Sequence, residues 1–202
     1  MRSMTRKFLT CFTLGMSFAC MPISQALAQG FSYNYLEGTY ERIDVDDNFI
    51  DGDGDGWGLS GSLEVANNWH VFTSFSKAEL DSGFGFDVDF DVTTVGGGYH
   101  RALAPNVDLV ANLSYVDVEA SGAGFSADDD GFGISIGARS LLRGNFELAG
   151  YIDYVDLDDG GDDTTIRGEG WYQLNRSFAL GAKLGIGDDV TRFGLAGRWY
   201  FR

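Results

Sequence analysis

The chain has 202 residues and a net charge of -16, with 44% hydrophobic and 14% aromatic residues. So acidic a chain is poorly suited to bind nucleic acid, whose phosphates attract Lys and Arg. Its two cysteines, Cys11 and Cys20, both fall near the N-terminus. No disulfide framework is therefore expected in the remainder, which must be held together by backbone hydrogen bonds and burial.

The first 28 residues are expected to be a cleaved secretory signal. They combine a positive start, an apolar run over residues 8–21 and a small-x-small cleavage site at Ala26-Leu27-Ala28. The apolar run is too short to cross a membrane as a helix. Removing these 28 residues, with their three positive charges, from the 202-residue chain of net charge -16 leaves 174 residues with a net charge of -19.

Processing as a lipoprotein at Cys20 is the alternative for this leader. Residues 17–19 lack the aliphatic residue expected three places before such a cysteine, so cleavage after Ala28 is favoured. The predicted organisation is a signal peptide at 1–28 and one folded domain at 29–202.

Beyond the leader, apolar and polar residues alternate with a period of two, which indicates β-strands rather than helices. Each stretch has about the ten residues that a tilted strand needs to cross a bilayer. Short connections alternate with longer acidic ones, which are expected to be loops at 44–56, 80–90, 119–130 and 157–163. Ten strands are predicted near 31–43, 57–66, 69–79, 91–101, 107–118, 131–142, 145–156, 164–174, 178–187 and 190–201.

A meander of even strand number, with short turns at one end and long connections at the other, is typical of an outer-membrane barrel. A soluble lipocalin-like barrel shares the meander but turns its apolar residues inward. Ten strands could not enclose so many apolar side chains, so these are predicted to face lipid while the polar faces line the lumen. The predicted fold is all-β, a closed antiparallel up-and-down transmembrane β-barrel of ten strands, with eight as the alternative.

Charged residues recur on the predicted inward faces. Because an unpaired charge in low-dielectric surroundings is costly, they are expected to form ion pairs across the lumen. Hairpin folding predicts three pairs, Asp153 with Arg167, Glu169 with Lys183, and Arg139 with Glu147. Closure of the last strand on the first brings Arg192 and Arg198 towards Glu37 and Glu41. The network could be a structural plug, which is favoured, or the selectivity filter of a narrow pore.

His70 and His100 fall on the inward parity and are predicted to face each other at the short-turn end. Two imidazoles could hold a metal or sense pH. No third ligand is evident, so a polar lining of the barrel mouth is favoured.

The stretch from Asp51 to Gly56 copies the opening of an EF-hand calcium loop, with carboxylates at Asp51, Asp53 and Asp55. The twelfth position is Ser62 rather than Glu, so full EF-hand coordination is not expected. Two interpretations of this stretch are left open, a weakly bound divalent cation at these three aspartates and a simple solvated loop. No other cofactor is expected.

Catalysis is poorly supported, and the chain is not expected to be an enzyme. Outer-membrane hydrolases need a histidine near the outer loops, where substrate arrives, and both histidines are predicted at the opposite end. The sequence also has no Gly-x-Ser-x-Gly motif in a strand-helix context.

With this meander, the leader and the aromatic last strand at 191–202, the chain resembles the small outer-membrane β-barrel proteins of the OmpA/OmpX-like type. It looks most like the vesicle-associated Ax-type surface proteins, through residues 32–38 and the Asp-Gly-Trp-Gly-Leu at 55–59. The resemblance implies insertion by the barrel-assembly machinery, with Trp199, Tyr200 and Phe201 as the insertion signal. Arg202 departs from the family, which usually ends on the aromatic residue itself.

The predicted location is the outer membrane of a Gram-negative cell, among phospholipid and lipopolysaccharide. The predicted role is structural or interactive, with acidic surface loops offered to an unknown extracellular partner by a monomer. A narrow passive, porin-like pore is the alternative, and an outer-membrane enzyme a distant third.

Overall fold

The computed structural model describes residues 31–47, 50–81, 87–122, 124–142 and 145–201. The expected signal peptide at 1–28 lies outside these residues. Among the residues described, no helix is long and apolar enough to cross a membrane.

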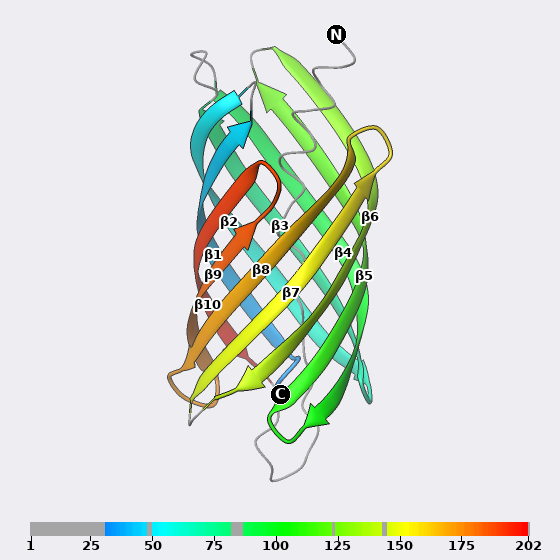
Figure 1. Ribbon diagram of the computed structural model, residues 1–202, viewed down its shortest axis with the longest axis vertical. Coiled ribbons are helices and arrows are strands. Elements are labelled where there is room, and N and C mark those ends of the chain that lie inside the picture. Colours follow the sequence, from blue (N-terminus) through cyan, green and yellow to red (C-terminus); the bar gives the residue numbers. More distant parts are fainter. Residues whose placement is uncertain (1–30, 48–49, 82–86, 123, 143–144, 202) are drawn as a thin grey trace.

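Ten antiparallel strands form one closed barrel, which confirms the fold predicted from the sequence (Figure 1). Each strand pairs with its neighbours in sequence, and β1 pairs with β10 to close the ring. The strands are β1 (Tyr35–Asp47), β2 (Ile50–Ala66), β3 (Trp69–Asp81), β4 (Asp87–Ala104), β5 (Val107–Gly122), β6 (Phe125–Leu141), β7 (Phe146–Leu157), β8 (Gly161–Gln173), β9 (Phe178–Ile186) and β10 (Val190–Tyr200).

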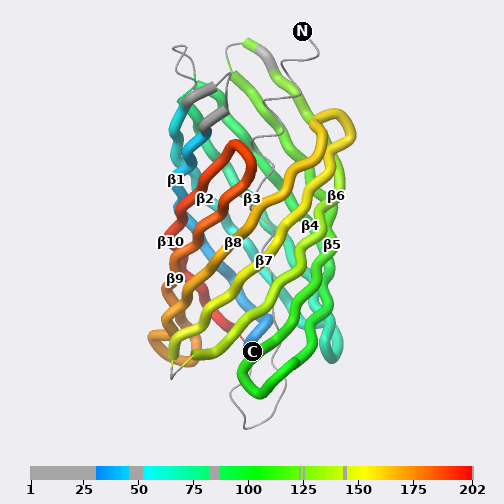
Figure 2. Tube along the Cα trace, viewed as in Figure 1, coloured from blue at the N-terminus to red at the C-terminus, as the bar shows by residue number. Residues whose placement is uncertain are grey.

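The two ends of the barrel differ. The turns after β2, β4, β6 and β8 lie at the end drawn lowest in Figures 1 and 2, where β1 also begins and β10 ends. We call this the lower end, and the opposite one the upper end.

The prediction of four long acidic loops is wrong. Strand β1 continues to Asp47 and β2 begins at Ile50, so most of the stretch 44–56 is a hairpin. In the stretch 80–90, β3 continues to Asp81 and β4 begins at Asp87, and residues 82–86 lie outside the described part. The stretch 119–130 is largely strand, and β7 and β8 are joined by residues 158–160 alone. Aspartate and glycine, which usually mark turns, here extend the strands upward.

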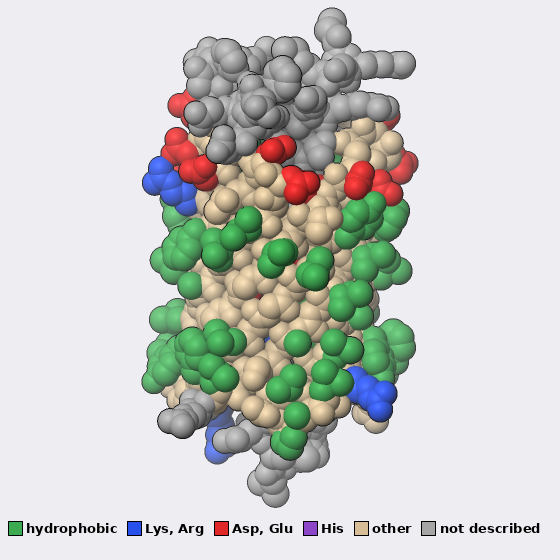
Figure 3. Space-filling model, in the orientation of Figure 1, with side chains coloured by type: hydrophobic (Ala, Val, Ile, Leu, Met, Phe, Trp, Pro, Cys, Tyr) green, Lys and Arg blue, Asp and Glu red, His purple; other side chains and the backbone are tan. Residues whose placement is uncertain are grey.

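The outward face is apolar over the middle and lower parts of the barrel (Figure 3). Leu59, Leu113 and Ile166 are 57%, 61% and 65% exposed, and many other large apolar side chains are exposed with them. A sheet that faced water on this side would be destabilised by so large an apolar surface. Aromatic side chains such as Trp57 and Trp69 stand near the edges of this band. The band is therefore the lipid-facing surface predicted from the sequence.

Above this band the two faces exchange their chemistry. In the lower part of β1, Leu36 and Tyr40 are exposed while Glu37 is buried in the lumen. Beyond Glu41, which still faces the lumen, the outward residues are Arg42 and Asp44, and the inward ones are Ile43 and Val45. The strands thus continue upward as a barrel of the water-soluble kind, polar outside and apolar inside.

The buried apolar residues of this upper part form one cluster contributed by six strands, the upper apolar ring. The sequence predicts a polar lumen, and at the upper end that expectation is wrong. The ring consists of Ile43, Val45, Ala78, Leu80, Val88, Phe90, Val92, Val116, Val118, Ala120, Val155, Leu157 and Val190.

Large inward-facing aromatic side chains lie opposite glycines on the next strand. Trp171 of β8 is register partner to Gly181 of β9, and Tyr151 of β7 to Gly137 of β6. A Cβ added at Gly181 would lie 2.4 Å from Trp171 Cε3, and one at Gly137 would lie 2.1 Å from Tyr151 Cδ1. Because these glycines have no side chain, they leave the space into which the two aromatic rings pack.

Replacing Gly181 by alanine is expected to destabilise the barrel by about 1–3 kcal/mol, because the new methyl group overlaps the Trp171 ring. Urea unfolding in phospholipid vesicles, followed by tryptophan fluorescence, measures the change. Gly150→Ala is the matched control, since Gly150 faces outward and a Cβ there would meet nothing within 4 Å. Equal unfolding midpoints for the two variants would contradict the packing argument.

Candidate functional site

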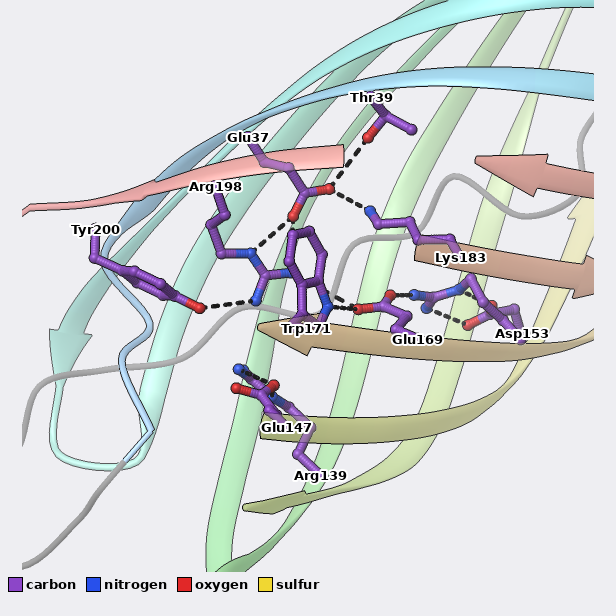
Figure 4. A network of polar contacts seen from close by, with 11 residues as sticks. Glu37, Thr39, Arg139, Glu147, Asp153, Glu169, Trp171, Lys183, Arg198 and Tyr200 are labelled. Carbon is purple, nitrogen blue, oxygen red and sulfur yellow. Dashed lines mark hydrogen bonds and ion pairs between the residues drawn. The ribbon is translucent and has the colours of Figure 1, made fainter. Parts of the chain in front are cut away.

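A network of buried charges runs along one wall of the lumen, and Glu37 of β1 stands at one end of it (Figure 4). Its Oε2 accepts a hydrogen bond of 2.8 Å from Arg198 Nε of β10, and its Oε1 accepts one from Lys183 Nζ of β9. The carboxylate thus ties two strands to β1, including the neighbour that closes the barrel.

Glu169 of β8 continues the network. Its Oε2 lies 3.7 Å from Arg198 NH2 and accepts a 2.9 Å hydrogen bond from Trp171 Nε1. Its Oε1 accepts a hydrogen bond from Arg167 NH1. Arg167 also donates to both oxygens of Asp153 on β7, at 2.7 and 3.2 Å, which is the forked geometry typical of a strong Arg–carboxylate pair.

Aromatic rings enclose the cations. The guanidinium carbon of Arg198 lies 3.8 Å from the Trp171 ring centroid and 4.1 Å from that of Tyr35. Arg167 lies 4.3 Å from the Tyr151 ring centroid. Such contacts become stronger where water is excluded, so they add to the ion pairs in holding the arginines in place.

Arg139 of β6 and Glu147 of β7 form a separate buried ion pair nearer the lower end. All eight residues predicted for the lumen network are buried, and each has a partner of opposite charge. Their burial is expected to be costly only if a partner is lost. Trp171, which links to Glu169, was on the predicted inward face but was not predicted as part of the network.

The strand register differs from the expected one in two hairpins. Arg167 lies opposite Tyr151 rather than Asp153, and Glu147 lies opposite Leu141 rather than Arg139, so both registers are two residues off. The predicted ion pairs form nevertheless, because a shift of two keeps both side chains on the same face and within reach.

Lys183 differs in its partner. It lies opposite Glu169 in the register, but the ion pair that the structure shows for it joins Nζ to Glu37. Strand β9 is thereby linked to β1 across β10.

The lower end of the lumen holds an aromatic stack. Tyr33, which precedes β1, stacks on His100 at 3.8 Å and on His70 at 5.0 Å between ring centroids. The two histidine Nδ1 atoms lie 3.5 Å apart, and His70 Nε2 lies 3.0 Å from Asn112 Oδ1. Within the described ranges, no group of three or more His, Cys, Asp or Glu side chains is arranged to hold a metal ion.

Hydroxyl groups line the lumen along β2 to β5, and Ser135 of β6 adds another on the strand that carries Arg139. Ser60, Ser76 and Ser135 are buried, yet their Oγ atoms have no hydrogen-bond partner among the residues described. Buried hydroxyls are normally satisfied by protein or by ordered water, so water is the expected partner here.

The stretch that resembles an EF-hand opening is part of β2, not a loop. In an extended strand, residues two apart are separated by about 6.6 Å, so the chain does not wrap around one ion as an EF-hand loop does. Asp53 pairs instead with Arg42 of β1 at 2.6 Å. The side chain of Asp51 lies outside the described part, and weak cation binding by Asp51, Asp53 and Asp55 stays a prediction.

Asp163 of β8 lies above the lipid-facing band, three residues before the exposed Ile166. It is buried, and this burial, with the negative charge of Asp188 nearby, raises the pKa of its carboxyl to about 7. The interior at this position is thus unfavourable to the charged form of the Asp163 carboxyl.

The predicted insertion signal lies at the end of β10. Trp199 faces outward, Tyr200 faces the lumen, and the rings of Trp199 and Phe201 are 5.8 Å apart. Their role in assembly stays a prediction.

The chain matches the family model "Outer membrane protein beta-barrel domain" over residues 11–167, more than half of its length, and therefore belongs to this family. A comparison with curated protein sequences gives no match. The protein is thus a small integral outer-membrane β-barrel, as predicted, whereas the narrower likeness to Ax-type proteins stays a prediction. In such barrels the connections that project furthest from the membrane are extracellular, and here the hairpins extend beyond the lipid-facing band at the upper end, so we take the upper end as extracellular and the lower end as periplasmic.

Several solved barrels are similar in fold. The KdgM porin in complex with disordered oligogalacturonate is 10% identical, with 83% of this chain and 99% of that chain covered and a TM-score of 0.47. The beta domain of the Bordetella autotransporter BrkA is 13% identical (83% and 99% covered, TM-score 0.48). Ail of Yersinia pestis is 18% identical (82% and 94% covered, TM-score 0.43). These identities and TM-scores are too low to indicate an activity.

Replacing Glu37 by glutamine is expected to destabilise the barrel by about 3–5 kcal/mol, because it leaves two buried cations, Arg198 and Lys183, short of negative charge. The measurement is again urea unfolding in vesicles. The control is Asp53→Asn, which removes an exposed ion pair with Arg42 and also a like charge opposite Asp44, and should not lower the midpoint. If both variants unfold at the wild-type midpoint, the network does not stabilise the fold.

Proposed function

We propose that this protein is a non-conducting outer-membrane barrel whose extracellular acidic rim binds a basic partner at the cell surface. The acidic rim is the set of outward-facing carboxylates above the lipid-facing band. They stand on rigid strands rather than on the loops expected from the sequence.

The observation that carries this proposal is that carboxylates face carboxylates across the hairpins of the rim. Like charges directly opposite each other destabilise a sheet, so a fold selected for stability alone would avoid them. The register partners are Asp44 with Asp53, Glu79 with Asp89, Asp117 with Asp130, Glu119 with Asp128, and Asp156 with Asp162. In two of the five pairs a cation of this chain already lies beside one carboxylate, Arg42 at Asp53 and Lys77 at Asp89; the other three indicate a surface prepared for positive charge from outside.

Two features support a closed lumen. The ion pairs and the aromatic rings around Arg198 fill the space along β1 and β7 to β10. Tyr33 lies across the periplasmic end, with its ring on both histidines and its carbonyl oxygen accepting a 2.8 Å hydrogen bond from Ser62 Oγ.

A narrow water-filled pore is the second candidate function. The buried hydroxyls of Ser60, Ser76 and Ser135, without protein partners in the described part, favour water along that wall. A path for small ions would then run beside the charged wall, and Arg167 would face it.

We also propose that residues 1–28 are removed during export and that the barrel-assembly machinery inserts the remainder as a monomer. The burial of Phe31 and Tyr33 within the barrel supports a folded domain that starts close to the expected cleavage site after Ala28. No chemical activity is proposed.

The double variant Glu119→Gln and Asp128→Asn is expected to bind a poly-lysine peptide at least tenfold more weakly than the wild type. It is also expected to unfold at a higher urea concentration, because an opposed pair of like charges is removed. Binding is measured by calorimetry in neutral detergent at two salt concentrations.

The matched control is Asp188→Asn with Asp189→Asn, which changes the net charge equally but lies in the turn after β9. A smaller loss of affinity is expected for this control. Equal losses would mean that net charge alone governs binding, and an unchanged affinity in both would refute a basic partner for the acidic rim.

Recordings in planar bilayers are expected to show no discrete conductance steps for the wild-type protein. Steps that change in size in Arg167→Ala but not in the exposed control Arg42→Ala would instead assign conduction to this lumen. That outcome would favour the pore over the closed barrel.

A further inference from the structure

The lipid-facing surface is not evenly filled. A groove of about 860 Å³ crosses it obliquely, from Asn175 in the turn after β8, over β9, β10, β1, β2 and β3, to Thr93 on β4. Strands lie about 4.8 Å apart, so the groove is roughly 24 Å long measured across the strands.

Glycines form the floor of this groove. Gly38 of β1 and Gly197 of β10 are register partners on the outward face at the seam where the barrel closes, and Gly61 of β2 continues the floor. Leucine and aromatic side chains stand on either side, so the hollow is walled by Leu59, Leu180 and Trp199.

Over Gly38 and Gly197 the hollow is open space and not a packing requirement of the barrel. A Cβ at Gly38 would meet only Leu59 Cδ2 at 3.8 Å, and one at Gly197 only Leu180 Cδ2 at 4.0 Å, both ordinary contacts. This is the opposite of Gly181 and Gly137, whose space is already occupied by rings. Something other than this chain is therefore needed to fill the groove.

The surroundings of the groove decide what fills it. It lies within the lipid-facing band, where the medium is hydrocarbon, and its walls are apolar. At its lower end the groove is lined by Asn175, and the next residue in the same turn, Arg176, is an exposed cation. An apolar channel with an exposed cation in the adjoining turn complements a lipid with an acyl chain and an anionic phosphate.

We propose that this groove binds one phospholipid of the periplasmic leaflet, with an acyl chain over Gly38 and Gly197 and its phosphate on Arg176. The site lies outside the barrel and is independent of the acidic rim and the lumen. It requires only the membrane location that the family establishes.

Native mass spectrometry of the protein, taken from vesicles of phosphatidylethanolamine and phosphatidylglycerol into detergent, tests the proposal. The wild type is expected to retain one phospholipid, identified by its mass. Gly38→Leu, which fills the groove, is expected to lower the lipid-bound fraction at least tenfold. Gly150→Leu is the matched control on the far side of the barrel, where a side chain meets only open space, and should retain the lipid as the wild type does.

A second variant, Arg176→Gln, tests the proposal without changing the packing of the barrel wall. Arg176→Gln lies in an exposed turn and is expected to reduce retention of phosphatidylglycerol several-fold. Folding of each variant is verified by its heat-dependent shift on gels. Retention of lipopolysaccharide in place of phospholipid, equal retention in all variants, or a dimer that Gly38→Leu dissociates would each overturn the proposal.

Discussion

The period of two along a β-strand is the constraint on which the rest of this structure depends. Because successive side chains point to opposite faces and the barrel leaves no free edge, each residue is committed to the lumen or to the outside. The surroundings of the barrel change from hydrocarbon to water along each strand. The outward-facing residues must therefore be apolar within the membrane and polar above it, and the inward-facing residues follow the opposite pattern. Strand β1 shows this most directly, with Glu37 and Ile43 both inward, and Leu36 and Asp44 both outward. The ion pairs, the upper apolar ring and the acidic rim follow from this single rule.

Parity was predictable from the sequence, whereas register was predicted correctly for β8 and β9, where Glu169 lies opposite Lys183, but not for every hairpin. The inward charges were identified because alternation alone separates them from the lipid-facing residues. Which residue lies opposite which depends on turn geometry, and two hairpins were misjudged by two residues. The ion pairs of Arg167 with Asp153 and of Arg139 with Glu147 form regardless, because long side chains reach a diagonal neighbour on the same face. An error of one residue would have placed each charge in lipid.

The upper third of the barrel was missed for a different reason. Aspartate and glycine usually indicate loops, and that rule prevailed over the alternation in Asp-Val-Asp-Phe-Asp-Val at 87–92, which is a clear strand signal. On the inward face, Gly181 and Gly137 leave the space that the rings of Trp171 and Tyr151 occupy. No sequence pattern reveals such a pairing, because it exists only once the register of two strands is known.

The exchange of chemistry between the two faces also sets the depth at which the barrel sits. Sinking by two residues would carry Arg42 and Asp55 into hydrocarbon, and rising would lift Tyr40 and Trp57 into water. Both displacements are unfavourable, so the residues at this level fix where the upper surface of the membrane lies on the barrel. Any hydrophobic mismatch with a thinner or thicker membrane must then be met by the surrounding lipid, which deforms at the periplasmic side while the extracellular boundary stays in place.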